Sequence, residues 1–246
     1  MDFNEFSSIF DTVMGDNGFS RFCGAPFAER FYRLTERMLE VNKTMNLTAI
    51  KEPRAVVLRH YADSLTVEPL LPQNASVVDV GCGAGFPSLP LAVCRSDLRI
   101  TALDSTEKRI RYVRDAAALL GCKHFTAVAA RAEEAGKERL REQFDVCVAR
   151  AVAALPVLAE LCLPFVKVGG KFLAMKSRRG EEEWESAAEV VARLGGELAT
   201  RHAIVLTGDG EQEERVIFEI GKVKPTPVQY PRAYAKIAGG VHGRTK

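Results

Sequence analysis

Residues 77–87 read VVDVGCGAGFP, an apolar strand that leads directly into a turn with glycine at every second position. Because glycine has no Cβ, Gly81, Gly83 and Gly85 let the backbone turn tightly and approach a ligand closely. A strand that runs into such a turn is typical of proteins that bind a nucleotide-like ligand on a parallel sheet. This stretch therefore predicts a fold class and a nucleotide-like cofactor together.

The spacing of the glycines distinguishes between two cofactors. A dinucleotide fingerprint needs Gly-x-Gly-x-x-Gly, and Phe86 occupies the position of its last glycine. Asp79, just before the turn, is more natural beside a cationic amine or sulfonium than beside a pyrophosphate. Both observations favour S-adenosylmethionine over NAD.

From residue 76 onward, strand-like and helix-like patterns alternate along the chain. Strands are predicted at Ser76–Val80, Ile100–Asp104, Phe125–Ala129, Phe144–Ala149 and Lys171–Met175. Helices are predicted at Pro87–Val93, Thr106–Leu120, Ala153–Phe165 and Glu181–Leu194. This alternation implies a parallel sheet with helices on both faces, and ligands bind such a sheet outside the carboxyl ends of its strands.

Two further strands, Glu197–Leu206 and Glu214–Ile220, are separated by the polar turn Gly208-Asp209-Gly210 and are predicted to form a hairpin. An antiparallel hairpin that closes a parallel sheet is the usual end of the class I S-adenosylmethionine-dependent methyltransferase fold. We therefore expect an α/β, Rossmann-like domain over residues 71–224, with a mostly parallel seven-stranded sheet that ends in this hairpin.

The remaining segments flank this domain. Residues 1–70 are predicted to form an N-terminal helical cap, because apolar residues such as Phe27 and Phe31 recur at helix spacing. Residues 225–246 are predicted to be a basic tail, since no Asp or Glu occurs from Lys222 onward. Such a tail is either a solvated, frayed segment or part of a contact with RNA.

Composition narrows the class of protein. A chain of 246 residues with 47% hydrophobic residues is long enough for one sizeable core. The 34 Lys and Arg residues against 32 Asp and Glu leave a net charge of +2, which is too small to indicate a nucleic-acid partner by itself. The six cysteines form no Cys-x-x-Cys pair, so neither a metal site nor a disulfide framework is expected.

The sequence predicts neither a membrane span nor a signal peptide. The longest apolar stretch, Ser88–Cys94, is far shorter than the roughly 20 residues that a membrane helix needs. Residues 1–5 are acidic, whereas the start of a signal peptide is basic. We therefore expect a cytoplasmic protein without membrane contact. No pattern reports on the oligomeric state, and our expectation is a monomer.

Charged residues follow the predicted strands at the edge where a ligand would bind. Asp104 ends the second strand, where a carboxylate can accept hydrogen bonds from both ribose hydroxyls; the alternative is a helix cap for residues 106–108. Residues 131–134, Arg-Ala-Glu-Glu, follow the third strand, where class I methyltransferases hold the adenine ring; the alternative is a solvated helix start.

The loop that begins at Arg150 is expected to face the methyl donor and acceptor. Enzymes that methylate exocyclic amines of adenine or cytosine carry Asp/Asn-Pro-Pro-Tyr there, and this chain has no Pro-Pro pair. Methylation at carbon 5 of a pyrimidine needs a cysteine nucleophile, commonly in a Pro-Cys pair, and the chain has none. The acceptor is therefore expected to be a ready nucleophile that needs no covalent help.

In order and spacing, several segments closely resemble the bacterial 16S ribosomal RNA guanine-N7 methyltransferases, the family also called glucose-inhibited division protein B. The matching segments are Asn46–Ile50, Arg59–Leu65, Val78–Pro87, Leu103–Ser105, Lys108–Arg109, Phe144–Asp145, Ala149–Ala151 and Tyr230–Arg232. The resemblance implies methyl transfer from S-adenosylmethionine to N7 of a guanine in the decoding region of 16S ribosomal RNA. The implied partner is this RNA, free or within the small ribosomal subunit.

The resemblance also assigns roles to residues. It implies that the cofactor is held by the residues at Gly81, Phe86 and Arg150 and by the backbone of Ala132 and Glu133. Together with the rest of the glycine turn and the ribose position, the predicted cofactor-binding set is Asp79, Gly81, Gly83, Gly85, Phe86, Asp104, Ala132, Glu133 and Arg150.

His60, Asp63 and Ser64 share one face of a predicted helix, at spacings of three and four. We interpret His60 and Asp63, with Arg150, as a catalytic group that holds the cofactor loop or the flipped base; the alternative is a packed, hydrogen-bonded cap interface. Guanine N7 has an in-plane lone pair and no proton, so an in-line transfer needs neither a general base nor a covalent intermediate. The predicted RNA-binding residues are Lys176, Arg178, Arg179 and Arg232.

Three other interpretations keep part of this pattern. A methyltransferase for a small molecule or a protein would share the cofactor site and differ in the acceptor. A Rossmann dehydrogenase would share the sheet, although Phe86 counts against it. A ribosome-assembly factor without activity would retain only the cofactor fold.

Overall fold

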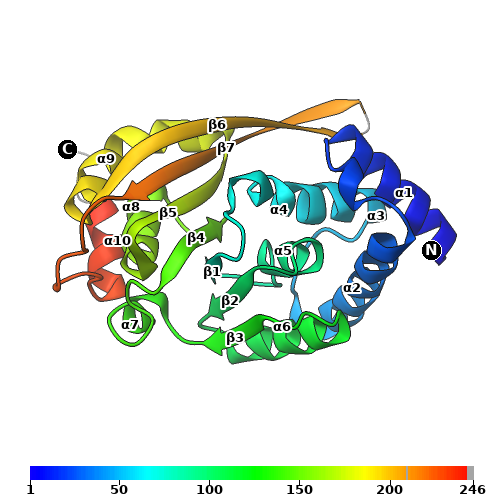
Figure 1. Cartoon of the computed structure of the whole chain (residues 1–246), viewed down its shortest axis with the longest axis horizontal. Coiled ribbons are helices and arrows are strands. Elements are labelled where there is room, and N and C mark those ends of the chain that lie inside the picture. Colours follow the sequence, from blue (N-terminus) through cyan, green and yellow to red (C-terminus); the bar gives the residue numbers. More distant parts are fainter. Residues whose placement is uncertain (209, 243–246) are drawn as a thin grey trace.

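A single seven-stranded sheet forms the centre of the molecule, in a computed structural model that describes residues 1–208 and 210–242 (Figure 1). The strands are β1 (Ser76–Val80), β2 (Arg99–Asp104), β3 (Phe125–Ala129), β4 (Phe144–Arg150), β5 (Val166–Ser177), β6 (Gly196–Gly208) and β7 (Glu211–Lys222). Their order is β3-β2-β1-β4-β5-β7-β6; β1 to β5 run parallel, and β7 is antiparallel to both β5 and β6. The predicted fold class is confirmed.

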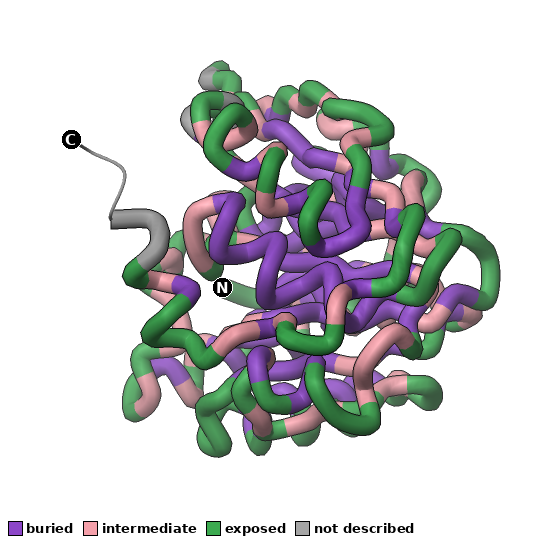
Figure 2. The backbone as a smooth tube through the Cα atoms, turned by 90° about the vertical axis from the view of Figure 1, so that its left-hand side faces the viewer, coloured by how far each residue is buried: buried purple, intermediate pink, exposed green. Residues whose placement is uncertain are grey.

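Side chains that alternate along the central strands explain why the sheet is buried on both faces. In β4, Val146 and Val148 pack into one hydrophobic cluster, and Cys147 and Ala149 pack into the other. A strand whose two faces are both covered reads as a continuous apolar run, as in parallel sheets generally. Figure 2 shows the result, with buried backbone through the interior and exposed backbone in the outer loops and helix faces.

Helices form a layer on each side of the sheet (Figure 1). One hydrophobic cluster includes residues of α5 (Ser88–Cys94) and α6 (Glu107–Leu119). The other hydrophobic cluster includes residues of α7 (Ala132–Ala135), α8 (Leu155–Cys162), η4 (Leu163–Phe165), α9 (Trp184–Arg193) and α10 (Tyr234–His242).

Two helices begin later than predicted. The helix predicted at 153–165 begins at Leu155, and Pro156 lies in its first turn, where the missing N–H of proline costs no hydrogen bond. The predicted helix at 181–194 begins at Trp184, after the short helical turn η5 (Arg178–Glu183).

The N-terminal residues are helical, as predicted. They form α1 (Phe3–Asp16), η1 (Ser20–Phe22), α2 (Ala25–Met45), α3 (Pro53–Val56), the π-helical segment η2 (Val57–Ala62), α4 (Asp63–Leu65) and η3 (Glu68–Leu70). In α2 the Phe31 ring lies 5.0 Å from that of Phe10 and 4.6 Å from that of Tyr61. Tyr61 in turn lies 6.0 Å from Phe86. A continuous row of aromatic rings therefore connects the outer helices to the glycine turn.

The β6–β7 hairpin extends beyond the sheet and lies over the N-terminal helices (Figure 1). Both strands are longer than predicted, and of the predicted turn, Asp209 falls outside the described residues. At this end the Asn17 side chain donates to the carbonyl of Thr207 at 3.0 Å and accepts from its N–H at 2.8 Å. This pair of hydrogen bonds fastens α1 to the hairpin.

Lys222 and Arg232, which belong to the basic end of the chain, both make contacts within the protein. Lys222 is buried, and its Nζ donates to the Leu163 carbonyl at 2.8 Å and lies 3.2 Å from the carboxylate of Glu142. Burial lowers the pKa of Lys222. Arg232 forms a forked pair with Glu160, whose side chain is 1% exposed, with N–O distances of 2.6 and 2.8 Å. The chain after β7 is thus tied back to α8.

Candidate active site

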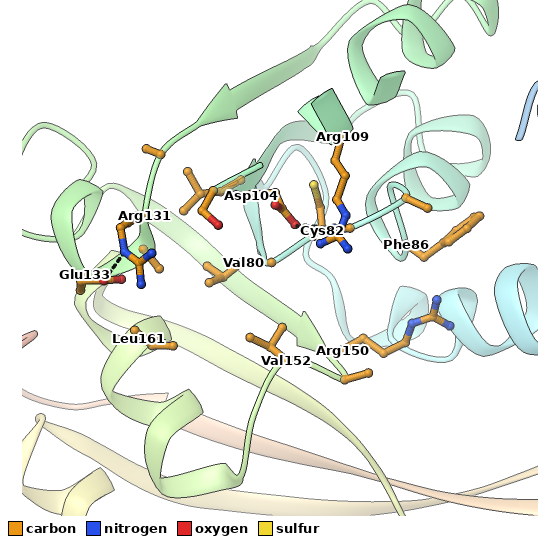
Figure 3. A pocket seen from close by; sticks show the side chains of 18 of the residues that line it. Val80, Cys82, Phe86, Asp104, Arg109, Arg131, Glu133, Arg150, Val152 and Leu161 are labelled. Atoms are coloured by element: carbon orange, nitrogen blue, oxygen red, sulfur yellow. Dashed lines mark hydrogen bonds and ion pairs between the residues drawn. The ribbon is translucent and has the colours of Figure 1, made fainter. Parts of the chain in front are cut away.

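A cavity of about 580 Å³ lies at the carboxyl ends of β1, β2, β3 and β4. Four loops line it, as Figure 3 shows: the turn after β1, the start of the β2–α6 loop, the β3–α7 loop and the loop after β4. They contribute Gly81–Ala84 with Phe86, Asp104–Ser105, Ala130–Glu133, and Arg150–Val152. These are the loops that the sequence predicted to meet around one ligand.

The glycines of the turn serve two different purposes. At Gly81 φ is +75°, and an added Cβ would lie 2.6 Å from Cγ2 of Val152, so a side chain there would close the cavity wall. At Gly85 φ is +87°, and an added Cβ would lie 2.5 Å from Cδ1 of Leu89. Gly85 does not line the cavity. It allows Leu89 of α5 to pack against the turn, whereas Gly81 keeps the cavity open.

Asp104 lies on the cavity wall and also organises the turn. Its Oδ1 accepts from the Thr106 N–H at 2.8 Å, and its Oδ2 accepts from the Gly83 N–H at 3.1 Å. The guanidinium of Arg109 lies 3.7 Å from Oδ2. Each carboxylate oxygen can accept two hydrogen bonds, so Asp104 keeps acceptor capacity toward the cavity. The alternative weighed for this residue was a helix cap; the N-cap position of α6 is Thr106, and Asp104 accepts from the N–H of that residue.

Asp79 lies behind the turn, not on the cavity wall. It is fully buried, and its Oδ2 accepts from the Ser88 N–H at 3.1 Å at the start of α5. Its Oδ1 has no hydrogen-bond partner among the described residues. Burial raises the pKa of Asp79 to about 7, against the opposing effect of its hydrogen bond from the Ser88 N–H. Asp79 and Gly85, which we expected at the cofactor, thus support the turn from behind.

Glu133 and Ala132 are placed on the opposite wall by α7. Glu133 is buried, and its Oε1 accepts from Nε of Arg131 at 2.6 Å. Both residues line the cavity at the end of β3 (Figure 3). A carboxylate held in this way at the start of a helix has one oxygen fixed and one available.

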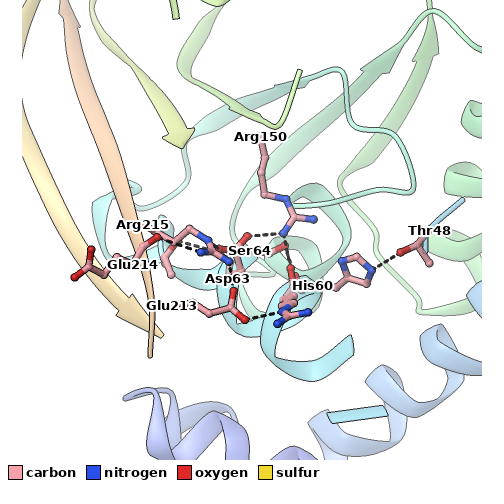
Figure 4. Close-up of polar contacts among 10 residues, drawn as sticks. Thr48, His60, Asp63, Ser64, Arg150, Glu213, Glu214 and Arg215 are labelled. Carbon is pink, nitrogen blue, oxygen red and sulfur yellow. Dashed lines mark hydrogen bonds and ion pairs between the residues drawn. The ribbon is translucent and has the colours of Figure 1, made fainter. Parts of the chain in front are cut away.

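Arg150 belongs to a charged network, centred on Asp63, that joins three parts of the chain (Figure 4). One nitrogen donates to Oδ2 of Asp63 at 2.6 Å and to the carbonyl of Arg59 at 2.8 Å. Oδ1 of Asp63 accepts from Nε of Arg215 in β7 at 3.0 Å. Glu213 accepts from Arg215 and from Arg59, at 2.5 and 2.6 Å. The network therefore couples the N-terminal helices, the loop after β4 and the hairpin.

His60 separates the network from the glycine turn. Its ring stacks on that of Phe86, with centroids 4.5 Å apart and planes 6° from parallel. Nε2 lies 2.9 Å from Oγ1 of Thr48, and Nδ1 has no partner among the described residues. Burial, assisted by the charge of Arg150, lowers the pKa of His60 to about 4. The imidazole is therefore neutral at pH 7.

The sequence predicted a shared helical face for His60, Asp63 and Ser64. In the structure His60 and Asp63 both line the second cavity, and the three side chains contact different partners. Because Val57–Ala62 is π-helical, the turn holds more residues than an α-helical turn. His60 faces Phe86, Asp63 faces the two arginines, and the Ser64 hydroxyl donates to the carbonyl of His60. Arg215 and Glu213 were not predicted as site residues.

A second cavity of about 480 Å³ adjoins the first. The two share a wall made of His60, Arg150 and Ala151. The remaining walls of the second cavity come largely from five elements: η2, α4, the end of β5, η5 and β7. Two adjoining chambers with a narrow shared wall suit a reaction in which a group passes from one bound molecule to another.

The predicted RNA-binding residues occupy different settings. Lys176 lines the second cavity, and its Nζ lies 2.9 Å from Glu183. The Arg178 side chain is 75% exposed and pairs with Glu214 at 2.8 Å. The side chain of Arg179 falls outside the described residues. Arg232 holds Glu160, so its guanidinium is engaged within the protein. RNA binding by these residues stays a prediction.

In the described part of the chain, no group of His, Cys, Asp or Glu side chains is arranged to hold a metal ion. Over the same residues, no helix is long and apolar enough to cross a membrane. The six cysteines are free thiols.

The fold and the glycine-turn cavity together define a class I methyltransferase fold. Solved structures share it at low sequence identity: TYW2 from P. horikoshii, in complex with MeSAdo, has a TM-score of 0.52 and 15% identity over 66% of this chain and 63% of that chain. TYW2 from M. jannaschii, in complex with AdoMet, has a TM-score of 0.50 and 16% identity over 61% of this chain and 70% of that chain.

Residues 28–208 match the family described as rRNA small subunit methyltransferase G. A relative from Leuconostoc citreum, named ribosomal RNA small subunit methyltransferase G, is 44% identical over 83% of this chain and 86% of its own length. A relative of the same name from Deinococcus radiodurans is 43% identical over 85% of this chain and 83% of its own length. The chain belongs to this family, which confirms the resemblance found in the sequence.

Proposed function

We propose that this protein transfers a methyl group from S-adenosylmethionine to N7 of a guanine in 16S ribosomal RNA. The observation that carries the proposal is the pair of adjoining cavities with His60, Arg150 and Ala151 as their shared wall, in a chain that belongs to the small-subunit RNA methyltransferase G family. One cavity suits the methyl donor and the other the base that accepts the group.

The residues of the first cavity fit S-adenosylmethionine. Asp104 presents carboxylate oxygens for the ribose hydroxyls, and Gly81 leaves room for close approach of a ligand to the backbone. The backbone of Ala132 and the side chain of Glu133 would hold the adenine ring, and Arg150 would hold the carboxylate. When bound, S-adenosylmethionine supplies an electrophilic methyl group on a sulfonium.

The remaining residues would act by positioning. Guanine N7 has a lone pair and no proton, so no side chain has to remove one. The purine becomes cationic as it is methylated, and a neutral His60 at the shared wall adds no opposing charge. The charge of Arg150 is balanced by Asp63. Holding two reactants in attack geometry can contribute roughly 7 to 11 kcal/mol to the lowering of the barrier.

We also propose that the protein acts in the cytoplasm as a monomer on its RNA partner, free or within the small subunit. The first alternative hypothesis is a methyltransferase that acts on a small molecule or a protein. Such an enzyme would bind the cofactor in the first cavity and a different acceptor in the second. The third hypothesis, an assembly factor without activity, would show no turnover.

The deciding experiment supplies labelled S-adenosylmethionine and small ribosomal subunits, or their naked RNA, from a strain that lacks this protein. We expect label in 16S ribosomal RNA as N7-methylguanine, at one mapped position. Transfer that survives ribonuclease treatment of the acceptor mixture would move the assignment to another acceptor. Absence of any turnover would favour the assembly factor.

Asp104→Asn should lower the affinity for S-adenosylhomocysteine by about 10-fold or more. An amide keeps the shape of the side chain but loses one acceptor and the negative charge that would face the ribose. Isothermal titration calorimetry measures the dissociation constant directly. Glu107→Gln is the matched control, since Glu107 lies in the first turn of α6 with its side chain 57% exposed and does not line the cavity. Equal affinities for both variants would contradict the role of Asp104.

A further inference from the structure

The second cavity contains an ion pair that the positioning of the donor does not use. Lys176 stands near the end of β5, and Glu183 ends η5. Their side chains meet with an N–O distance of 2.9 Å. Both residues line the second cavity and neither lines the first, so the pair lies away from the wall that the cavities share.

Each partner keeps hydrogen-bonding capacity. Nζ of Lys176 donates to the Ala153 carbonyl at 2.8 Å and to Glu183, which leaves one of its three N–H donors for a ligand. Oε2 of Glu183 accepts from Lys176 and from the Leu155 N–H at 2.5 Å. Among the described residues, no partner contacts Oε1. The Glu183 side chain is 30% exposed.

The other carboxylate of this cavity is already paired with two arginines. Both oxygens of Asp63 are paired, one with Arg150 and one with Arg215, and the Asp63 side chain is only 8% exposed. A base that enters the second cavity therefore finds an acceptor in Glu183, and a donor next to it in Lys176.

Of the two purines, this donor–acceptor pair matches guanine. The Watson–Crick edge of guanine presents the O6 acceptor beside the N1–H and N2–H donors. Adenine presents a donor at position 6 and an acceptor at N1, which would face a lysine and a carboxylate respectively and be repelled by both. We propose that Lys176 donates to O6, and Glu183 accepts from N1–H and N2–H, so that the pair selects guanine; this rests on the proposed function.

The same placement directs the reacting atom. N7 belongs to the five-membered ring of guanine, on the side of the purine away from N1 and N2. A base whose Watson–Crick edge is held at Lys176 and Glu183 turns its five-membered ring away from them, toward the wall of His60, Arg150 and Ala151. Recognition of the base and presentation of N7 to the donor cavity are then the same event.

The test compares guanosine with inosine at the methylated position of the RNA, using the acceptor that the wild-type protein methylates. Inosine keeps O6 and N1–H but lacks the N2 amino group. We expect kcat/KM of the wild-type protein to fall by about 10-fold or more with inosine, because Glu183 then loses one donor. Glu183→Gln should lower kcat/KM for guanosine by a similar factor and bring the guanosine-to-inosine ratio to within about two-fold.

Two further variants separate recognition from structure. Lys176→Met should lower kcat/KM for both RNAs by the same factor, because both carry O6, and should leave their ratio at the wild-type value. Glu182→Gln is the matched control: Glu182 is an exposed residue of η5 that lines neither cavity, so both rate constants should stay at the wild-type level. Affinity for S-adenosylhomocysteine and the unfolding temperature check that each variant is folded.

The outcomes are distinguishable. A Glu183→Gln protein that keeps the wild-type ratio overturns the assignment of Glu183, whatever its activity. If that variant does not fold, because Glu183 also holds the start of α8, the wild-type protein decides alone: equal kcat/KM for guanosine and inosine overturns the proposal. A wild-type protein that methylates no guanine overturns the proposed function itself.

Discussion

Replacing Arg150 by alanine should lower kcat/KM for methyl transfer by about 100-fold or more. Arg150 lines both cavities, and its guanidinium lies 5.6 Å from the Phe86 ring. The substitution removes the Arg150 side chain from the shared wall and leaves the buried carboxylate of Asp63 with Arg215 as its remaining partner. Removal of one member of a buried charged pair typically costs several kcal/mol, because the other charge stays desolvated. Steady-state kinetics with RNA and S-adenosylmethionine measure the loss.

A double-mutant cycle tests whether the network acts as a unit. Asp63→Asn should lower kcat/KM substantially by itself, and the double variant Arg150→Ala/Asp63→Asn should lose less than the two single losses combined. Arg111→Ala is the control, since Arg111 is 64% exposed on α6 and lines neither cavity. Arg150→Ala with cofactor affinity and turnover both within about two-fold of the wild type would refute the role of Arg150.

Asp79→Asn should stabilise the ligand-free protein clearly more at pH 8 than at pH 5. The ordinary pKa of 3.8 rises to about 7 in the folded protein, because the carboxylate is buried. The folded state therefore keeps its proton where the unfolded state has lost it. The stability that this proton contributes is complete below pH 4 and is lost as the pH rises toward 7. The largest expected gain for the variant is about 4 kcal/mol.

The asparagine fits the site. Its carbonyl can accept from the Ser88 N–H, and its amide then faces the Ser88 hydroxyl, which is buried without a partner among the described residues. Urea unfolding at pH 5 and pH 8 measures the free energy of unfolding. Asp97→Asn is an informative control, because hydrogen bonds from Arg95 hold the pKa of Asp97 well below its ordinary value. Its effect should be the same at both pH values. A constant effect of Asp79→Asn over this range would contradict the buried-carboxylate argument.

Local patterns predicted most of the fold. The bounds of β1 and β3 agree with the prediction to the residue, because glycine, polar and charged residues interrupt the apolar runs at the strand ends. The parallel sheet with its terminal hairpin followed from the alternation of strands and helices, since that alternation allows few topologies.

Pairing between distant segments limited the prediction of the site. Arg215 reaches Asp63 across 152 residues, through the register of an antiparallel hairpin that no local pattern determines. The position of the Asp79 side chain was not determined by the local pattern either, because it depends on which face of β1 is turned toward which helices. In β1 the neighbours Val78 and Val80 pack toward the α8 side, so the Asp79 side chain lies on the opposite face, under α5. A glycine turn indicates a ligand nearby, but it does not say which side of the strand the ligand occupies.

The pair of hydrogen bonds between Asn17 and Thr207 has a consequence for folding during translation. The two residues are separated by 190 positions, so during translation α1 is synthesised long before the strand that holds it. A nascent chain that stops before residue 207 carries the entire glycine turn, yet its first helices lack their partner and Asp63 lacks Arg215. Contacts of such long range form late and slowly. The binding loops are therefore encoded early, but the site becomes complete only after the hairpin has left the ribosome.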